Sequence, residues 1–400
     1  MKIKRRELCF FQIQDNVQPD LSGLLRGEVR LTQKTTVTLL CPINGERIPL
    51  TAEELHFIAS LPVGWTEVAT PSNLSISGSS LSRLVRLGIL ISDDTNDGRS
   101  IALAASEELC KQIGWHPLAQ LYHSMTRWSD KSTPDATEDM GKEHRQAQLT
   151  QHAAIHGPIP THFPDHPGGL GKIALPEPAD YDTFDEVLLK RKTTRHFDTS
   201  RALPESIFGT ILHRTFGAMG TEDLAPGMTA IKRTSPSGGS LHPIEAYPLV
   251  MNVEGLKPGL YHYESSRHHL NYLKPMSLEE ARRTAKILVI GQTYFSDAAA
   301  LVFHVARLDR HHWKYRNHPK AYRAVTLDSG HLSQTFYLLG SHLGLGTFYT
   351  AAINDANLEE LLCLDNLKSM VVGANGVGII DESQNSLHLS PTRMPKRATV

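Results

Sequence analysis

The sequence feature that most constrains this chain is the segment at residues 234–243, which reads TSPSGGSLHP. Two adjacent glycines, Gly238 and Gly239, permit positive φ angles and let a flat ligand approach the backbone without meeting a Cβ atom. The serines of the segment add short hydroxyls, so the loop could hydrogen-bond the edge of a planar heterocycle. Such clusters are also common in ordinary surface loops. The prediction of a ligand site therefore depends on a second segment.

That second segment is residues 190–197, which read KRKTTRHF and follow a short amphipathic pattern typical of a helix. Its cations suit a phosphate, because arginine offers a planar fork, lysine a point charge and threonine a neutral donor. A solvated basic turn is the alternative interpretation. The phosphate interpretation assigns this role to Arg191, Lys192, Thr193 and Arg195.

Together the two segments resemble the nitroreductase-like flavoproteins, and more closely the SagB-type dehydrogenases, whose flavin loop reads Pro-Ser-(Ala/Gly)-Gly-x-Leu-His-Pro. The resemblance implies an α+β fold over about half the chain, with FMN as cofactor and its phosphate on the basic segment. It also implies a second backbone stretch across the ring, at Thr350 and Ala351. The residues it places along the isoalloxazine are Pro236, Ser237, Gly238, Gly239 and Ser240.

A third cluster, residues 311–316, reads HHWKYR. SagB-type azoline dehydrogenases carry a Lys-Tyr pair at the equivalent place, which implies catalytic roles for Lys314 and Tyr315. Oxidising an azoline needs a carbon-bound proton removed, and a lysine whose pKa is lowered by burial and neighbouring cations can accept it. A solvated basic loop is the alternative.

Composition narrows the function classes. The chain has 400 residues, enough for two domains, and a formal net charge of −1, which provides no bulk field to attract nucleic acid. Its four cysteines form no CxxC pair, and His152 and His156 alone do not complete a metal site, so no metal is expected. The sequence shows neither a signal-peptide pattern nor a membrane-length apolar run, which predicts a cytoplasmic protein without membrane contact.

The N-terminal part, residues 1–110, is predicted to form a small winged-helix-like domain. A capping box begins at Thr51, a second helix covers residues 79–87, and residues 89–91 and 101–103 flank a polar turn typical of a hairpin wing. Through residue 103 there are 11 Lys/Arg and 11 Asp/Glu, so the basic face of a DNA reader is missing. The pattern resembles PqqD-like domains that bind leader peptides. An extension that only packs on the catalytic domain is the alternative.

Residues 129–180 are rich in proline and histidine and are predicted to form a linker. From residue 181 to 383 helical and strand patterns alternate, which predicts the nitroreductase-like FMN-binding domain. Its longest helix is expected from near residue 324 to 343, because Leu332, Phe336, Leu339 and Leu343 recur on one helix face.

These observations favour an FMN-dependent oxidoreductase that oxidises azolines to azoles in a ribosomally made precursor peptide. Its partners would be the precursor peptide, a cyclodehydratase or another maturation enzyme, and a second copy in a homodimer. One alternative is an NAD(P)H-dependent reductase acting on a nitroaromatic, quinone or dehydroamino acid. Another is a leader-binding scaffold subunit whose flavin is structural.

Overall fold

A computed structural model describes residues 2–62, 64–68, 76–132, 141–162, 171, 173–176 and 182–384. The chain divides into two compact units. The first comprises Met1–Arg127, Arg307–Val325 and Cys363–Met370, and the second comprises Trp128–Ala306, Thr326–Leu362 and Val371–Val400. The second unit mixes helices and sheet, and the N-terminal region forms separate small domains. The expected α+β class is therefore confirmed.

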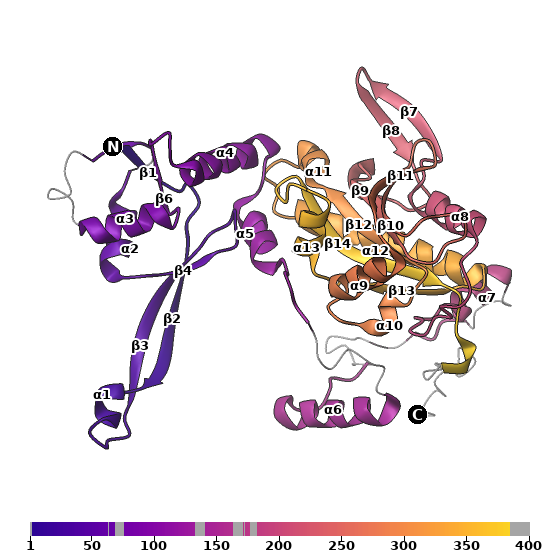
Figure 1. Cartoon of the computed structure of the whole chain (residues 1–400), viewed down its shortest axis with the longest axis horizontal. Coiled ribbons are helices and arrows are strands. Elements are labelled where there is room, and N and C mark those ends of the chain that lie inside the picture. Colours follow the sequence, from indigo (N-terminus) through magenta and orange to yellow (C-terminus); the bar gives the residue numbers. More distant parts are fainter. Residues whose placement is uncertain are drawn as a thin grey trace. The chain divides into compact units, whose positions relative to one another are not determined.

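A six-stranded sheet in the order β11-β10-β9-β12-β14-β13 forms the centre of the C-terminal part (Figure 1). In this sheet β12 pairs antiparallel with β9, with Phe303 opposite Tyr247, and β13 pairs antiparallel with β14, with Phe348 opposite Gly376. A separate two-stranded sheet, β7-β8, leaves this body as a hairpin. The strands are β7 (Gly220–Ala225), β8 (Met228–Lys232), β9 (Ile244–Val250), β10 (Gly259–Glu264), β11 (His269–Pro275), β12 (Ala300–Arg307), β13 (Gly346–Thr350) and β14 (Ser369–Gly378).

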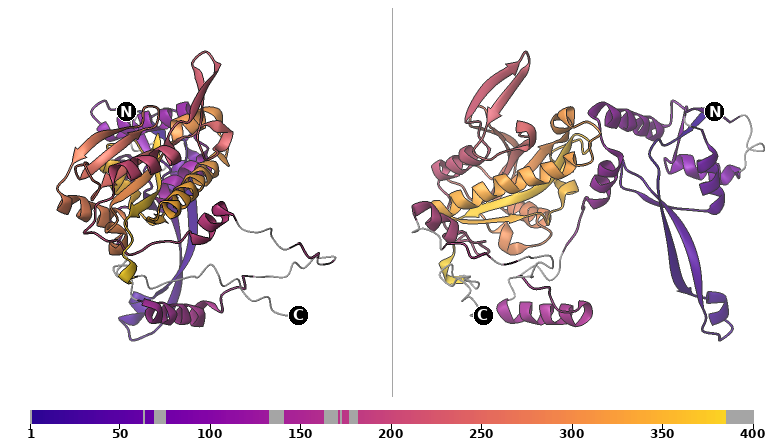
Figure 2. Two further views of the ribbon diagram at one scale, coloured as in Figure 1. Left: turned by 90° about the vertical axis from the view of Figure 1, so that its right-hand side faces the viewer. Right: turned by 180° about the vertical axis from the view of Figure 1, so that it is seen from behind.

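The helices of this part include one of 22 residues, α12 (Ala321–His342), which lies beside β14 (Figure 2). Leu332 and Phe336 are buried on its inner face, as the sequence periodicity predicts. Leu345 donates its backbone N–H to the carbonyl of Gly340, and Gly344 has φ +70°, which closes the C-terminus. The other helices are α7 (Thr183–Lys190), α8 (Glu205–Phe216), η3 (Gly238–Ser240), α9 (Leu278–Leu288), α10 (Thr293–Ser296), α11 (Leu308–Lys314), α13 (Asp355–Leu361) and η4 (Glu382–Gln384).

The glycines of the last strand, β14, leave room for aromatic side chains. A Cβ atom at Gly376 would lie 2.0 Å from the ring of Phe348, and one at Gly373 would lie 2.3 Å from the hydroxyl of Tyr349. The glycines that weaken a strand pattern in the sequence are thus the positions where the rings of Phe348 and Tyr349 pack against β14.

The N-terminal region contains a three-stranded sheet β5-β1-β6 and a second sheet β2-β3-β4. Its core includes Ile3, Leu39, Phe57, Leu84 and Leu90. The capping box at Thr51 is confirmed. The elements are β1 (Lys2–Arg5), β2 (Phe10–Pro19), α1 (Leu21–Leu24), β3 (Leu31–Leu40), β4 (Arg47–Leu50), α2 (Ala52–Ser60), β5 (Thr66–Glu67), α3 (Gly78–Arg86), β6 (Leu90–Ser92), α4 (Gly98–Ile113) and α5 (Pro117–Thr126).

The predicted hairpin wing is wrong. Residues 101–103 do not form its second strand but lie in α4, which begins after the polar turn. Asp97 caps this helix, because its carboxylate accepts the backbone N–H of Ser100 at 3.2 Å. Leu103, Cys110 and Ile113 are then buried at helical spacing. The aspartates expected at the tip of a wing are instead the start signal of a helix.

The predicted linker contains a helix, α6 (Gly141–His156), on which the rings of His152 and His156 lie 4.4 Å apart. Most of its prolines lie outside the described residues, and the predicted domain boundaries stay predictions. Within the described part of the chain, no group of three or more His, Cys, Asp or Glu side chains could hold a metal ion. No helix found there is long and apolar enough to cross a membrane.

Candidate functional site

The glycine-rich loop is fastened to α12 by side chains at both of its early serines. Ser235 is buried, and its hydroxyl lies 2.6 Å from that of Thr335 and donates to the carbonyl of His331 at 3.3 Å. These contacts join segments about one hundred residues apart in the sequence. The first turn of the loop is therefore part of the packed body and not a free surface segment.

Asp328 of α12 makes the central contact with the loop. Its side chain is 3% exposed, and its two carboxylate oxygens accept from the hydroxyl of Ser237 at 2.5 Å and from the backbone N–H of Gly238 at 2.9 Å. A hydrogen bond to a charged group contributes about 1.5–3 kcal/mol. Asp328 was not among the residues predicted from the sequence. Nothing in its local pattern distinguishes it from an ordinary helix carboxylate.

The loop backbone is held in an uncommon conformation. Gly239, Ser240 and His242 have φ values of +63°, +58° and +45°. For residues with a Cβ atom this left-handed region costs free energy, and such residues persist where the surroundings fix them. The backbone N–H of His242 donates to the Ser237 hydroxyl at 2.9 Å, which links the end of the loop to its anchor.

The anchoring decides which loop atoms could meet a ligand. The hydroxyls of Ser237 and Ser235 form hydrogen bonds with Asp328 and Thr335 of α12. Pro236, Gly239 and Ser240 are exposed. The expectation that all three serines offer their hydroxyls to a ligand is thus narrowed to Ser240. A planar group would meet the exposed face formed by Pro236, Gly239 and Ser240.

The basic segment is brought to the far half of α12 and to β13. Thr194 donates its N–H to the carbonyl of Thr347 at 2.8 Å, and the hydroxyl of Thr193 lies 3.0 Å from that of Tyr337. The Tyr337 hydroxyl also accepts the N–H of Tyr349 at 2.9 Å. The guanidinium of Arg191 lies 5.4 Å from the centre of the Tyr337 ring. Tyr337 therefore joins the predicted phosphate segment to the strand that ends at Thr350.

Three cations of this segment fit an anion. Arg191, Lys192 and Arg195 are partly buried. None of the three has a carboxylate within 4.0 Å among the described residues. Withdrawing a cation from water without a counter-charge costs free energy, which a bound anion would offset. Their spread over five residues is suited to one terminal phosphate, so the donor set is compatible with FMN. Ala351 is exposed where the chain leaves β13, and Thr350 is buried at the strand's end.

A buried chain of polar side chains runs beneath the loop. The Nδ1 atom of His304 lies 2.8 Å from the hydroxyl of Ser329, which lies 3.0 Å from the hydroxyl of Tyr349. Burial lowers the pKa of His304 to about 3, so this imidazole stays neutral at ordinary pH. Burial raises the pKa of Tyr349. The neighbouring Asp328 and Ser329 thus connect the glycine-rich loop to an uncharged hydrogen-bonded core.

The predicted catalytic pair lies at the end of α11, where Lys314 is the last helical residue. Lys314 is exposed, so the burial on which its role as a base depended is absent here. Its ammonium lies 5.7 Å from the centre of the Tyr315 ring. The buried members of this cluster are His311 and His312, and the Nε2 atom of His311 lies 2.9 Å from the carbonyl oxygen of Ala321. Lys314 and Tyr315 belong to the first compact unit, and their catalytic role remains a proposal.

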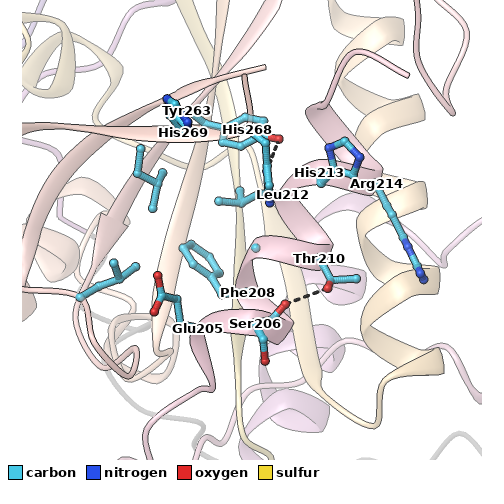
Figure 3. A pocket seen from close by; sticks show the side chains of 13 residues that line it. Glu205, Ser206, Phe208, Thr210, Leu212, His213, Arg214, Tyr263, His268 and His269 are labelled. Carbon is cyan, nitrogen blue, oxygen red and sulfur yellow. Dashed lines mark hydrogen bonds between the residues drawn. The ribbon is translucent and has the colours of Figure 1, made fainter. Parts of the chain in front are cut away.

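Two cavities of the second unit differ in their relation to the loop. One of about 690 Å³ is bounded by the β7-β8 hairpin and by loop residues, among them Pro236, Ser237, Ser240 and His242. The other, of about 740 Å³, lies between α8 and the β10-β11 turn (Figure 3). It shares no lining residue with the loop.

Three histidines, His213, His268 and His269, line the second cavity (Figure 3). The ring centroids of His213 and His268 are 4.8 Å apart, and the Tyr263 hydroxyl lies 2.8 Å from Nδ1 of His268. Burial, with His213 and His269 nearby, lowers the pKa of His268. Only the hairpin cavity adjoins the loop, so it is the better candidate for a reacting site.

Comparison with known proteins gives one family match. Residues 188–379 match the model of the nitroreductase family and form a nitroreductase-family domain. Members of this family are generally flavin-dependent oxidoreductases. The chain is 28% identical over 195 residues to a nitroreductase-like protein of Methanocaldococcus jannaschii, a match that covers 49% of this chain and 91% of that protein.

A second relative is the trifolitoxin-processing protein TfxB of Rhizobium leguminosarum, 29% identical over 136 residues. That match covers 34% of this chain and only 36% of the length of TfxB. Among solved structures, a chain of the Escherichia coli microcin synthetase McbBCD complex aligns with a TM-score of 0.49 and 17% identity, over 68% of this chain and 98% of that one.

Proposed function

We propose, starting from the nitroreductase-family domain at residues 188–379, that this chain is an FMN-dependent oxidoreductase of peptide maturation. It would oxidise thiazoline or oxazoline rings of a precursor peptide to the aromatic azoles. The observation that carries the proposal is the loop at residues 235–242, which Asp328 of α12 holds, together with the basic segment at residues 191–195, which contacts α12 and β13. Arg191, Lys192 and Arg195 of that segment have no carboxylate partner in the described chain. The similarity to TfxB, whose name states that it processes trifolitoxin, supports a role in the maturation of a natural product.

Each part of the site has a role in this proposal. Arg191, Lys192 and Arg195 would hold the phosphate, and the exposed face of the loop would meet the ring system. When bound, FMN would supply the two-electron oxidation. Asp328 would act as a positioning residue, because it holds the loop and does not face the ligand.

The proton of the substrate carbon needs an acceptor. Lys314 is our candidate, with Tyr315 orienting the substrate. His242 lines the hairpin cavity and is the alternative acceptor within the second unit.

The test begins with the absorbance of the purified protein, which should show bound FMN released on denaturation. A synthetic peptide carrying one thiazoline should then bleach the flavin under anaerobic conditions. The thiazole product should have lost two hydrogen atoms, so its mass should be about two units below that of the starting peptide. A peptide whose ring is already a thiazole is the matched control and should leave the colour unchanged. Bleaching by both peptides, or by neither, would contradict the proposal.

An NAD(P)H-driven reductase is the second candidate. The match to the archaeal nitroreductase-like protein covers 91% of that relative and favours it. Rapid bleaching by NAD(P)H alone, without bleaching by a thiazoline peptide, would give this function the lead.

The N-terminal domain would recognise the leader of the precursor. Its balanced charges argue against DNA. Titration of the full chain against duplex DNA at low salt should give no binding, and salt-sensitive binding would contradict this assignment.

A further inference from the structure

We propose that the trough between the β7-β8 hairpin and the loop at residues 234–242 is a binding surface for an extended polypeptide segment. This inference rests on the proposed function, and it names the substrate class that the site is built to receive. The trough is the cavity of about 690 Å³, within the size range of ligand sites.

The base of the hairpin is rigidly held. Arg233 is buried and donates from Nη1 to the carbonyl of Ile244 at 2.7 Å. The hydroxyl of Thr234 donates to the carbonyl of Arg214 at 2.6 Å, and Met219 donates its N–H to the carbonyl of Lys232 at 2.7 Å. The hairpin therefore has a fixed position relative to the loop that follows it.

The strands beyond this base are unsupported. All six residues of β7 are exposed, and the sheet has only two strands. Neither outer edge has a strand partner among the described residues. An isolated two-stranded hairpin is marginally stable in water. Its free N–H and C=O groups are suited to pairing with a further extended segment. Leu224 near the tip is 62% exposed, an apolar side chain that a partner would cover.

The wall of the trough also favours a peptide over a small aromatic molecule. Gly220 pairs with Lys232 and Glu222 with Ala230, so two small residues share one face with two opposite charges. Glu222 and Lys232 are exposed, and neither forms an ion pair within the described chain. A small nitroaromatic would favour an enclosed apolar pocket. An open polar wall, in which each of two small residues pairs with a charged one, fits a polypeptide backbone with mixed side chains.

The test is a variant with a shorter β7-β8 hairpin that keeps the strand register at the hairpin's base. Replacing residues 222–230 by Asn-Gly leaves Thr221 opposite Ile231 across a two-residue turn. We expect the Kd of a fluorescein-labelled thiazoline peptide to rise at least roughly tenfold, as for a lost set of strand contacts. Flavin content should stay at the wild-type level. Glu279→Lys, an exposed change on α9, is the control variant and should leave the Kd unchanged.

The outcomes separate the two proposals. An unchanged Kd in the shortened variant, or no measurable binding of thiazoline peptides to the wild type, would overturn the trough as a peptide site. Loss of flavin from the shortened variant would also overturn it, because the hairpin would then be structural. Peptide binding that depends on the hairpin in a wild-type protein without flavin would support the trough and contradict the proposed oxidation.

Discussion

Short sequence motifs point to both the glycine-rich loop and the cluster at residues 311–316, yet the two regions differ in how firmly the structure holds them. The loop is held by a buried carboxylate, and three of its residues have φ values between +45° and +63°. Lys314, by contrast, is exposed at the end of a seven-residue helix. The loop is already held in one geometry by its own unit, so its role can be tested on this chain alone. The exposed Lys314 would need a bound substrate, or another protein surface, to exclude water and fix its position.

The largest effect is expected at the exposed region. Lys314→Ala should reduce the rate of flavin reduction by a thiazoline peptide by roughly 10²–10⁴, the span of a positioned acid or base. Its fold and flavin content should remain. Tyr315→Phe should lose less if the phenol only orients the substrate. Single-turnover absorbance measurements would give the rates, and an unchanged rate in Lys314→Ala would move the base elsewhere, with His242 tested next.

Substitution of Asp328, which holds the loop, should change the affinity for FMN. Asp328→Ala removes two hydrogen bonds to a buried carboxylate and should weaken FMN binding roughly 10- to 100-fold, from about 1.5–3 kcal/mol. Asp328→Asn keeps the shape and one acceptor, so its Kd should lie between those of Asp328→Ala and the wild type. Fluorescence titration of the apoprotein measures both. Equal FMN affinity in all three proteins would show that the loop does not depend on Asp328.

The buried polar chain below the loop predicts a pH effect of smaller size. His304 has a pKa of about 3 in the fold against 6.5 ordinarily, so the unfolded chain binds the extra proton below pH 6.5. The free energy of unfolding should therefore fall as pH drops from 6.5 towards 3. His304→Asn removes this titrating group. Between pH 6.5 and 5 the variant should therefore lose about 2 kcal/mol less of its free energy of unfolding than the wild type does. Urea unfolding at both pH values measures it, with exposed His318→Asn as control. Equal slopes in both variants would contradict the assignment.

The sequence predicts most of the second unit because its signals are local. The period of Leu332 and Phe336 marks α12, and Pro204 and Gly217 mark the ends of α8. The pairing of Asp328 with Ser237 could not be predicted, since it joins residues 91 positions apart. The β7-β8 hairpin was missed because its first strand, GTEDLA, has few β-branched or aromatic residues. The wing was misassigned because an aspartate-rich turn serves a helix cap as well as a hairpin.

The central claim is that the segment at residues 191–195 holds the phosphate of FMN beside the fixed loop. The direct measurement is the flavin content of Arg191→Ala/Arg195→Ala compared with the wild type and with Arg282→Ala/Arg283→Ala, a matched pair on α9. We expect the wild type and the α9 variant to release FMN in equal amounts. The Arg191/Arg195 variant should purify colourless while keeping the circular dichroism of the wild type. Full flavin content in that variant would contradict the account.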